Sequence, residues 1–232
     1  MNNILIVGNS QTLLEKNNGK RIDAFDYVVR MGDSPRIRGY EQYVGTKTDM
    51  FRMKWFNYFN VDICTGDINF GKPRTSFEFE YRDILCISQD PDYFTETATS
   101  FNRYVTDSLN RSFYYHIGNR YLHDVAIKNF NLTTKKWYVF NADDMQDLVV
   151  NMNNYSTKVN YTNGIEPSGG LCTIWFFIKN YPKSNITITG FDGWASGHYW
   201  KPNKIPFFSS HSGVYETMFI KQLIKKGRLF IL

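Results

Sequence analysis

The sequence predicts an α/β fold, a single-domain Rossmann-like sheet with helices on both faces. Three observations support this prediction. Short apolar runs alternate with helix-compatible segments, as in parallel sheets built from strand–helix–strand units. Two of the runs end directly in a glycine turn. The chain has 232 residues, of which 42% are hydrophobic. This is enough for one sizeable core, so we treat residues 1–232 as a single domain.

The first predicted strand is the apolar run at residues 4–7, which stops at Gly8-Asn9-Ser10 before a helix-compatible stretch at 12–16. Further strands are predicted at residues 25–31, 82–88, 137–140 and 185–189. In a parallel sheet, ligands bind beyond the carboxyl ends of the strands. We therefore expect Gly8-Asn9-Ser10 and Gly190-Phe191-Asp192 at one such edge.

Two helices are predicted in the second half of the chain. Residues 171–179 are apolar all round, which indicates a buried helix beginning after Pro167-Ser168-Gly169-Gly170. A second, amphipathic helix follows His211. Its predicted apolar side carries Val214, Met218, Leu223 and Ile224, and its predicted solvent-exposed side carries Lys221 and Lys225. Residues 151–155 are predicted to be a surface segment.

Composition and charge narrow the class of protein. The formal net charge is +5, spread along the chain apart from a basic group formed by Lys221, Lys225, Lys226 and Arg228. This suits an anionic substrate or a membrane surface. There is no basic and aromatic motif, which argues against a nucleic-acid partner. The chain shows no signal peptide and no apolar run of about 18 residues. It is expected to be cytoplasmic, at most peripheral to a membrane.

Two glycine-bearing turns are candidate binding sites. In Gly8-Asn9-Ser10 and Ser168-Gly169-Gly170 the small residues let a ligand approach the backbone, and helix N-terminal amides favour anions. Neither turn matches the glycine-rich patterns of dinucleotide domains or P-loops, which argues against both. Each turn alone is equally consistent with an ordinary structural turn.

His198 and His211 are the candidate catalytic residues, since both lie in segments rich in glycine, serine or tryptophan at the predicted ends of elements. Glu216 falls in the first turn of the predicted helix. An acidic side chain there either stabilises the helix or has a functional role, and the residues leave both interpretations open.

A metal site is the main alternative. Asp90-Pro91-Asp92 follows a predicted strand, and such a pair of aspartates can hold the Mg²⁺ or Mn²⁺ of transferases that use nucleoside-diphosphate sugars. The same three residues are also typical of an ordinary turn. A metal-dependent glycosyltransferase using Asp90 and Asp92 therefore stays open, as does a non-catalytic glycan-binding module.

Four motifs in order carry a family resemblance. They are residues 6–10 with 22–31, 39–41 and 44–49, then Pro167 to Gly170 with 186–191, then His198-Tyr199-Trp200, and finally His211 to Glu216. With these motifs the chain resembles the sialyltransferases of glycosyltransferase family 29 over nearly its whole length.

The resemblance implies a GT-A variant that works by an inverting, metal-independent mechanism and takes a CMP-activated sugar, with no cofactor. His211 would be the general base and His198 would bind the donor phosphate. Phe191 and nearby backbone would lie beside the cytidine. The substrate-binding residues implied are Gly8, Asn9, Ser10, Arg30, Gly32, Ser168, Gly169, Gly170, Gly190, Phe191, Asp192, Trp194 and Tyr199.

The chain departs from the family pattern at Gly32, where the family usually has an asparagine that touches the donor. The expected donor sugar is therefore sialic acid or Kdo, the two 2-keto acids carried on CMP. The expected acceptor is a glycan or glycolipid such as lipo-oligosaccharide or capsule. The paired cysteines and the N-terminal anchor of animal members are missing, which fits a bacterial or viral enzyme.

Overall fold

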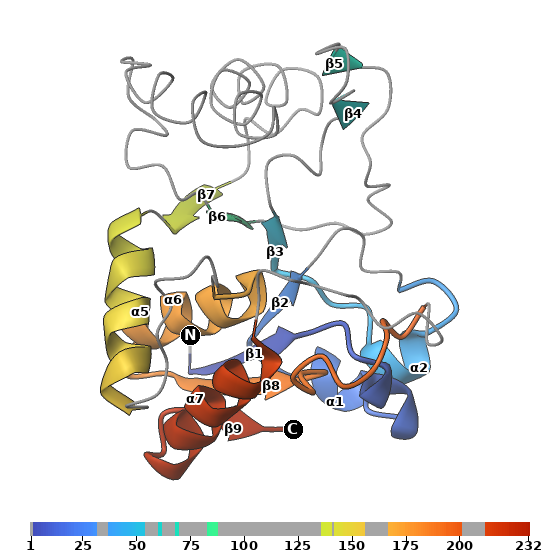
Figure 1. Ribbon diagram of the computed structural model, residues 1–232. Coiled ribbons are helices and arrows are strands. Elements are labelled where there is room, and N and C mark those ends of the chain that lie inside the picture. Colours follow the sequence, from blue (N-terminus) through green and yellow to red (C-terminus); the bar gives the residue numbers. More distant parts are fainter. Residues whose placement is uncertain are drawn as a thin grey trace.

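A computed structural model describes residues 2–31, 37–53, 60–61, 68–69, 83–87, 136–140, 142–155, 167–200 and 212–232. Its main feature is a seven-stranded sheet with the order β7-β6-β3-β2-β1-β8-β9 (Figure 1). All six neighbouring pairs of this sheet are parallel. The strands are β1 (Asn3–Val7), β2 (Tyr27–Met31), β3 (Met50–Met53), β6 (Asp83–Ile87), β7 (Lys136–Phe140), β8 (Asn185–Thr189) and β9 (Phe230–Ile231). Two short strands, β4 (Asn60–Val61) and β5 (Ile68–Asn69), pair antiparallel in a separate sheet.

Helices cover both faces of the large sheet, as the sequence predicts (Figure 1). The alternation of side chains along β1 explains why. Ile4 and Ile6 point into one core and Leu5 and Val7 into the other, and none of the four is more than 2% exposed. The first core is closed by α5 (Ala142–Tyr155), α6 (Gly169–Asn180) and α7 (Gly213–Lys225), and the second by the 3₁₀ helix η1 (Gln11–Glu15) with α1 (Gly19–Asp23) and α2 (Glu41–Val44).

The predicted strands are confirmed, with bounds that differ by up to two residues. The predicted buried helix is α6, whose Leu171, Cys172, Ile174 and Phe177 are buried. Seven elements were not predicted: α1, α2, α5, β3, β4, β5 and β9. Residues 151–155, expected as a surface segment, form the last turns of α5, where Met152 is 1% exposed and packs in the core. No helix within the described ranges is long and apolar enough to cross a membrane.

The predicted apolar side of the last helix is wrong in part. Leu223 is buried, but Val214 and Met218 are exposed and share a side of α7 with Lys221 and Lys225. The sequence pattern does not identify the buried side, because apolar residues occur all round this helix. Which side becomes buried is decided by the neighbours that it meets in the tertiary structure, among them α5 and the start of α6.

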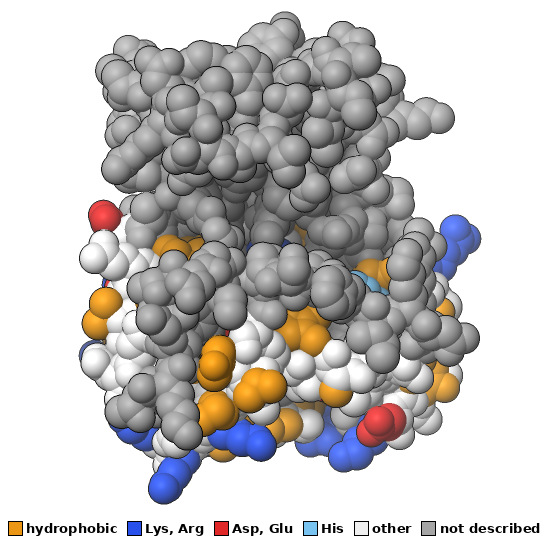
Figure 2. All heavy atoms as spheres, in the orientation of Figure 1, with side chains coloured by type: hydrophobic (Ala, Val, Ile, Leu, Met, Phe, Trp, Pro, Cys, Tyr) orange, Lys and Arg blue, Asp and Glu red, His pale blue; other side chains and the backbone are white. Residues whose placement is uncertain are grey.

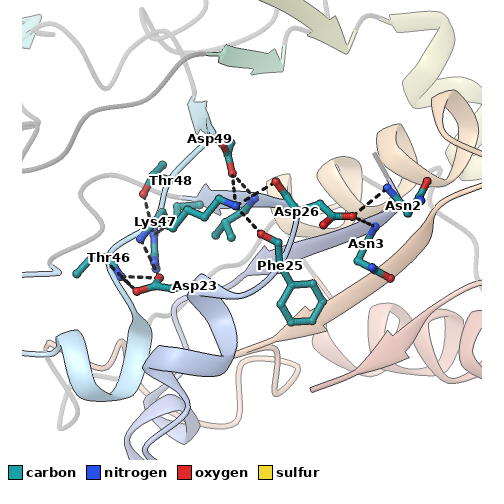
Figure 3. A network of polar contacts seen from close by, with 11 residues as sticks. Asn2, Asn3, Asp23, Phe25, Asp26, Thr46, Lys47, Thr48 and Asp49 are labelled. Carbon is teal, nitrogen blue, oxygen red and sulfur yellow. Dashed lines mark hydrogen bonds and ion pairs between the residues drawn. The ribbon is translucent and has the colours of Figure 1, made fainter.

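A polar network holds the amino ends of β1, β2 and β3 together (Figure 3). The Asp23 carboxylate accepts hydrogen bonds from the backbone nitrogens of Thr46 and Lys47 at 2.8 Å. The Lys47 ammonium donates to the carbonyls of Phe25 and Asp26 and lies 3.7 Å from an Asp49 carboxylate oxygen. Asp26 in turn accepts from the backbone nitrogens at the start of β1. These contacts fix the ends of the strands opposite to those where ligands are expected.

Arg30 in β2 is buried in the same region and is 1% exposed. Its guanidinium donates to the carbonyls of Val44 and Lys47 and to the Thr48 hydroxyl, at 2.8 to 3.1 Å. Burial lowers the pKa of Arg30 to about 10, so the group remains charged at neutral pH. The segment 44–49 therefore wraps a buried cation, which explains its polar sequence without a ligand.

Candidate active site

The turns that follow β1 and β8 meet at the carboxyl edge of the sheet. The Gly8 nitrogen donates to the Thr189 carbonyl at 2.8 Å, and the Ser10 nitrogen donates to the Gly190 carbonyl at 3.1 Å. A Cβ atom on Gly8 would lie 2.2 Å from the Gly190 oxygen, so any larger residue would push the two turns apart. This close approach explains Gly8, while Gly190 has a φ of 71° and a Cβ there would lie 2.9 Å from the Leu13 side chain.

A cleft opens beside these two turns. Its volume of about 100 Å³ is below the roughly 300–1,000 Å³ of typical small-molecule sites, so it would hold one part of a larger ligand. Its walls come from the ends of β1, β2 and β8, the start of α6 and the first turns of α7. The lining residues are Gly8, Asn9, Ser10, Met31, Ser168, Gly170, Gly190, Phe191, Asp192, Gly193, Trp194, Ser196, Gly197, His198, Glu216, Thr217 and Ile220.

The N-termini of α6 and α7 converge on this cleft. Ser168 is the N-cap of α6, and its hydroxyl accepts from the Leu171 nitrogen at 3.2 Å. Ser212 caps α7 in the same way, accepting from the Tyr215 nitrogen. Each helix N-terminus carries unpaired amide N–H groups and a positive partial charge. Two of them at one cleft favour an anionic ligand.

Glu216 joins the two helix starts. Its carboxylate accepts from the Ser168 nitrogen and from the Ser168 hydroxyl, both at 2.6 Å, and its side chain is buried. Burial raises the pKa of Glu216 to about 7, while the two hydrogen bonds from Ser168 oppose the rise. The carboxyl group is therefore poised to change its protonation state near neutral pH.

His198 also lines the cleft and belongs to the segment after β8. Its backbone forms an isolated antiparallel bridge with Ser10, and the Tyr199 nitrogen donates to the Asn9 carbonyl at 3.0 Å. The imidazole stacks on the Trp200 ring with centroids 4.7 Å apart. The bridge and the stacking together fix the ring at the cleft wall.

Two further side chains shape the cleft. The Asn9 amide nitrogen donates to the Met31 carbonyl at 3.1 Å and so ties the end of β1 to the end of β2. The Asp192 carboxylate accepts from the Trp194 nitrogen and from the Ser196 hydroxyl. These contacts hold the loop from Phe191 to Gly197 in place.

Most of the predicted substrate-binding residues lie together at this cleft. They are Gly8, Asn9, Ser10, Ser168, Gly170, Gly190, Phe191, Asp192 and Trp194, and the predicted catalytic His198 lines the cleft with them. Their contacts with a substrate stay predictions. Gly32 and His211 lie outside the described residues, as do Asp90 and Asp92 of the alternative metal site.

Three predicted site residues lie elsewhere. Arg30 is enclosed by the 44–49 segment. Tyr199 is 2% exposed and packs edge-on against Tyr40 in the second core. Gly169 backs onto the buried Arg52 guanidinium, which lies 1.6 Å from where a Cβ would be. These three residues do not line the cleft among the described residues, and their contacts with a substrate stay predictions.

The cleft also contains residues that the sequence reasoning did not select. These are Met31, Gly193, Ser196, Gly197, Thr217 and Ile220, and Glu216 was left open. Ser196 and Gly197 could have been predicted from the sequence, because they belong to the same small-residue segment as His198. Thr217 and Ile220 carry no such signal, since only the packing of α7 decides which side meets the cleft.

The sequence and the fold agree with one family. A model of glycosyltransferase family 29, the sialyltransferases, matches residues 2–228.

The chain belongs to glycosyltransferase family 29.

The family 29 chain is similar to curated relatives over a shorter stretch. CMP-N-acetylneuraminate-beta-1,4-galactoside alpha-2,3-sialyltransferase from Homo sapiens is 46% identical over 46 residues, and its Mus musculus counterpart is 44% identical. The aligned stretch is 20% of this chain and only 12% of the length of either relative.

Solved structures share the fold along the full chain. A mammalian sialyltransferase in complex with Gal-beta-1-3GalNAc-ortho-nitrophenol has a TM-score of 0.57 at 16% identity, covering 100% of this chain and 69% of that one. A second mammalian sialyltransferase structure also has a TM-score of 0.57, at 15% identity, covering 100% of this chain and 68% of that one. At these identities the similarity establishes the α/β fold.

Proposed function

We propose that this chain is a sialyltransferase, a single domain of the GT-A variant type, that transfers sialic acid from CMP-sialic acid to a hydroxyl of a glycan or glycolipid. The observation that carries the proposal is the meeting of two helix N-termini with His198 at one cleft, in a chain that belongs to family 29. The proposed donor carries two anionic groups, the phosphate and the sugar carboxylate. Helix N-terminal amides are suited to both.

The proposed reaction inverts the configuration of the sugar. The acceptor oxygen attacks C2 of the sialic acid and gives up its proton to His211. The bond between C2 and the phosphate oxygen breaks, and CMP leaves with the bonding electrons. Negative charge grows on the phosphate in this step, where His198 and the amides at the start of α6 can stabilise it. A histidine that titrates near neutral pH suits the proton transfer.

We propose that the reaction needs no metal, because the groups above can supply the charge stabilisation that a cation would otherwise give. The parts of the chain that the structure describes contain no group of three or more histidine, cysteine or acidic residues placed to hold a metal. Asp90 and Asp92 lie outside those parts. Activity in EDTA is therefore the test that separates the two mechanisms.

A transfer assay tests the proposed donor. The purified protein is incubated in EDTA with a β-galactoside acceptor and either CMP-sialic acid or CMP-Kdo, and the products are identified by mass spectrometry. The proposal predicts a sialylated product and release of CMP. A product from CMP-Kdo alone would reassign the donor sugar. Glycan binding without any donor turnover would favour a non-catalytic module.

A further inference from the structure

Helix α7 has an exposed side that combines apolar and basic residues. Val214 is 69% exposed and Met218 is 47% exposed, and Lys221 and Lys225 are exposed as well. Their spacings of four, three and four residues place them within about 60° of one another around the helix. We call these four residues the outer face of α7. Figure 2 shows hydrophobic and basic side chains gathered over this helix.

The orientation of the outer face is fixed by the opposite side of the helix. Phe219 and Leu223 are 3% exposed and pack in the first core, and Glu216 is held by Ser168. Thr217 and Ile220, on a third side, line the cleft. The cleft and the outer face thus lie on neighbouring sides of one helix.

The exposed charged residues of α7 and of the segment that follows it are all basic. Lys226 and Arg228 are exposed just beyond the end of α7, and they extend the basic group of Lys221 and Lys225. The one acidic residue between positions 212 and 232 is Glu216, which is buried. Exposed apolar side chains beside lysines, on a helix side that carries no acidic residue of its own, are typical of helices that lie at a membrane interface. Anionic headgroups attract such basic clusters.

We propose that the outer face of α7 docks on an anionic lipid bilayer. Val214 and Met218 enter the boundary between headgroups and acyl chains, while the lysines contact the headgroups. This contact places the cleft on the neighbouring side of the same helix, within about one helix diameter of the lipid surface. The membrane contact stands on the exposed residues alone. Its use, to bring a glycolipid acceptor to the cleft, rests on the proposed function.

Vesicle flotation tests the docking. The full chain is mixed with vesicles of phosphatidylcholine alone or of phosphatidylcholine with phosphatidylglycerol. We expect the protein to float with the anionic vesicles and not with the neutral ones. Binding should weaken between about 0.1 M and about 1 M salt, where the Debye length falls from roughly 10 Å to roughly 3 Å. A protein that stays with the soluble fraction at low salt would overturn the proposal.

Two variants, of the outer face and of the adjoining Lys226, locate the contact. The triple change Lys221→Gln, Lys225→Gln and Lys226→Gln should weaken binding by roughly 10²-fold, about fivefold for each basic side chain. The double change Val214→Gln and Met218→Gln should weaken it by about tenfold, because two exposed apolar side chains can no longer enter the interface. None of these residues lines the cleft, so a thermal shift with CMP should be unchanged in both variants.

The matched control removes three exposed cations from the other helix layer, by Lys16→Gln, Lys20→Gln and Arg38→Gln. It should float like the unchanged protein. Equal losses in the control and in the lysine variant would mean that binding follows net charge only, and would overturn the proposed face. A dimer that the Val214→Gln and Met218→Gln variant converts to a monomer, seen by light scattering, would assign the face to a second copy and would also overturn it.

Discussion

Glu216 accepts two hydrogen bonds from Ser168, one from the backbone nitrogen and one from the hydroxyl, each at 2.6 Å. The two residues are 48 positions apart in the chain and are both buried. Ser168 caps α6, and Glu216 lies in the first turn of α7. The contact therefore sets the distance between the two helix starts that form one side of the cleft.

Glu216→Ala should lower both stability and ligand affinity. It leaves the buried Ser168 nitrogen without its acceptor, which costs about 1–3 kcal/mol in the free energy of unfolding. It should also weaken CMP binding, since the start of α6 loses its support. Urea unfolding and calorimetry measure the two effects. Glu216→Gln keeps an oxygen acceptor and should retain most of both properties, and the exposed Lys221→Ala should change stability by less than about 0.5 kcal/mol.

The same residue predicts how stability depends on pH. The folded-state pKa of Glu216 is raised to about 7 by burial, above its ordinary value of 4.5. Between these two values the folded chain binds more protons than the unfolded chain. The contribution of Glu216 is therefore fully present below about pH 4.5 and is lost as the pH rises through about 7. Urea unfolding from about pH 5 to about pH 8 should show this fall relative to Glu216→Gln. Parallel pH profiles for the two proteins would contradict it.

His211→Ala should separate chemistry from binding. If His211 takes the acceptor proton, its removal lowers kcat by about 10² to 10⁴-fold while CMP affinity stays nearly the same. Steady-state kinetics and calorimetry on the same sample give the two quantities. Turnover close to that of the unchanged protein would remove His211 from the mechanism.

His198→Ala should affect binding as well as turnover. His198 lines the cleft and its ring stacks on Trp200, which places it beside the proposed position of the donor phosphate. We expect weaker CMP binding by calorimetry together with a lower kcat. His198→Ala with the CMP affinity of the unchanged protein would exclude the phosphate role. Trp200→Leu is a useful companion variant, because it removes the stacking partner while the imidazole group itself is retained.

The meeting of Gly8 with Gly190 was predictable, because both follow apolar strands and parallel strands end at one edge. The role of Arg30 was not, because a buried cation bound to carbonyls looks in sequence like a cation that binds a ligand. Val214 and Met218 were predicted to lie on the apolar side of the last helix, but they are exposed on the outer face of α7. Local pattern predicts five of the seven strands of the large sheet. The choice between the sides of an apolar helix depends on tertiary neighbours that no spacing encodes.

The structure also explains why Glu216 could not be assigned from sequence. An acid in the first turn of a helix is usually accounted for by the helix dipole. Its actual partner is Ser168, the cap of another helix, and only the packing of α6 against α7 brings the two together.

The most direct test of the account is a thermal shift of the purified protein with CMP, UDP or GDP, first in EDTA and then with Mn²⁺. A ligand at about 100 times its Kd stabilises a protein by roughly 2.7 kcal/mol. For a chain of this size that corresponds to a rise in Tm of roughly 5–10 °C. The account predicts a shift with CMP alone, already in EDTA. A shift only with UDP or GDP in the presence of Mn²⁺ would contradict it and would move the chemistry to Asp90 and Asp92.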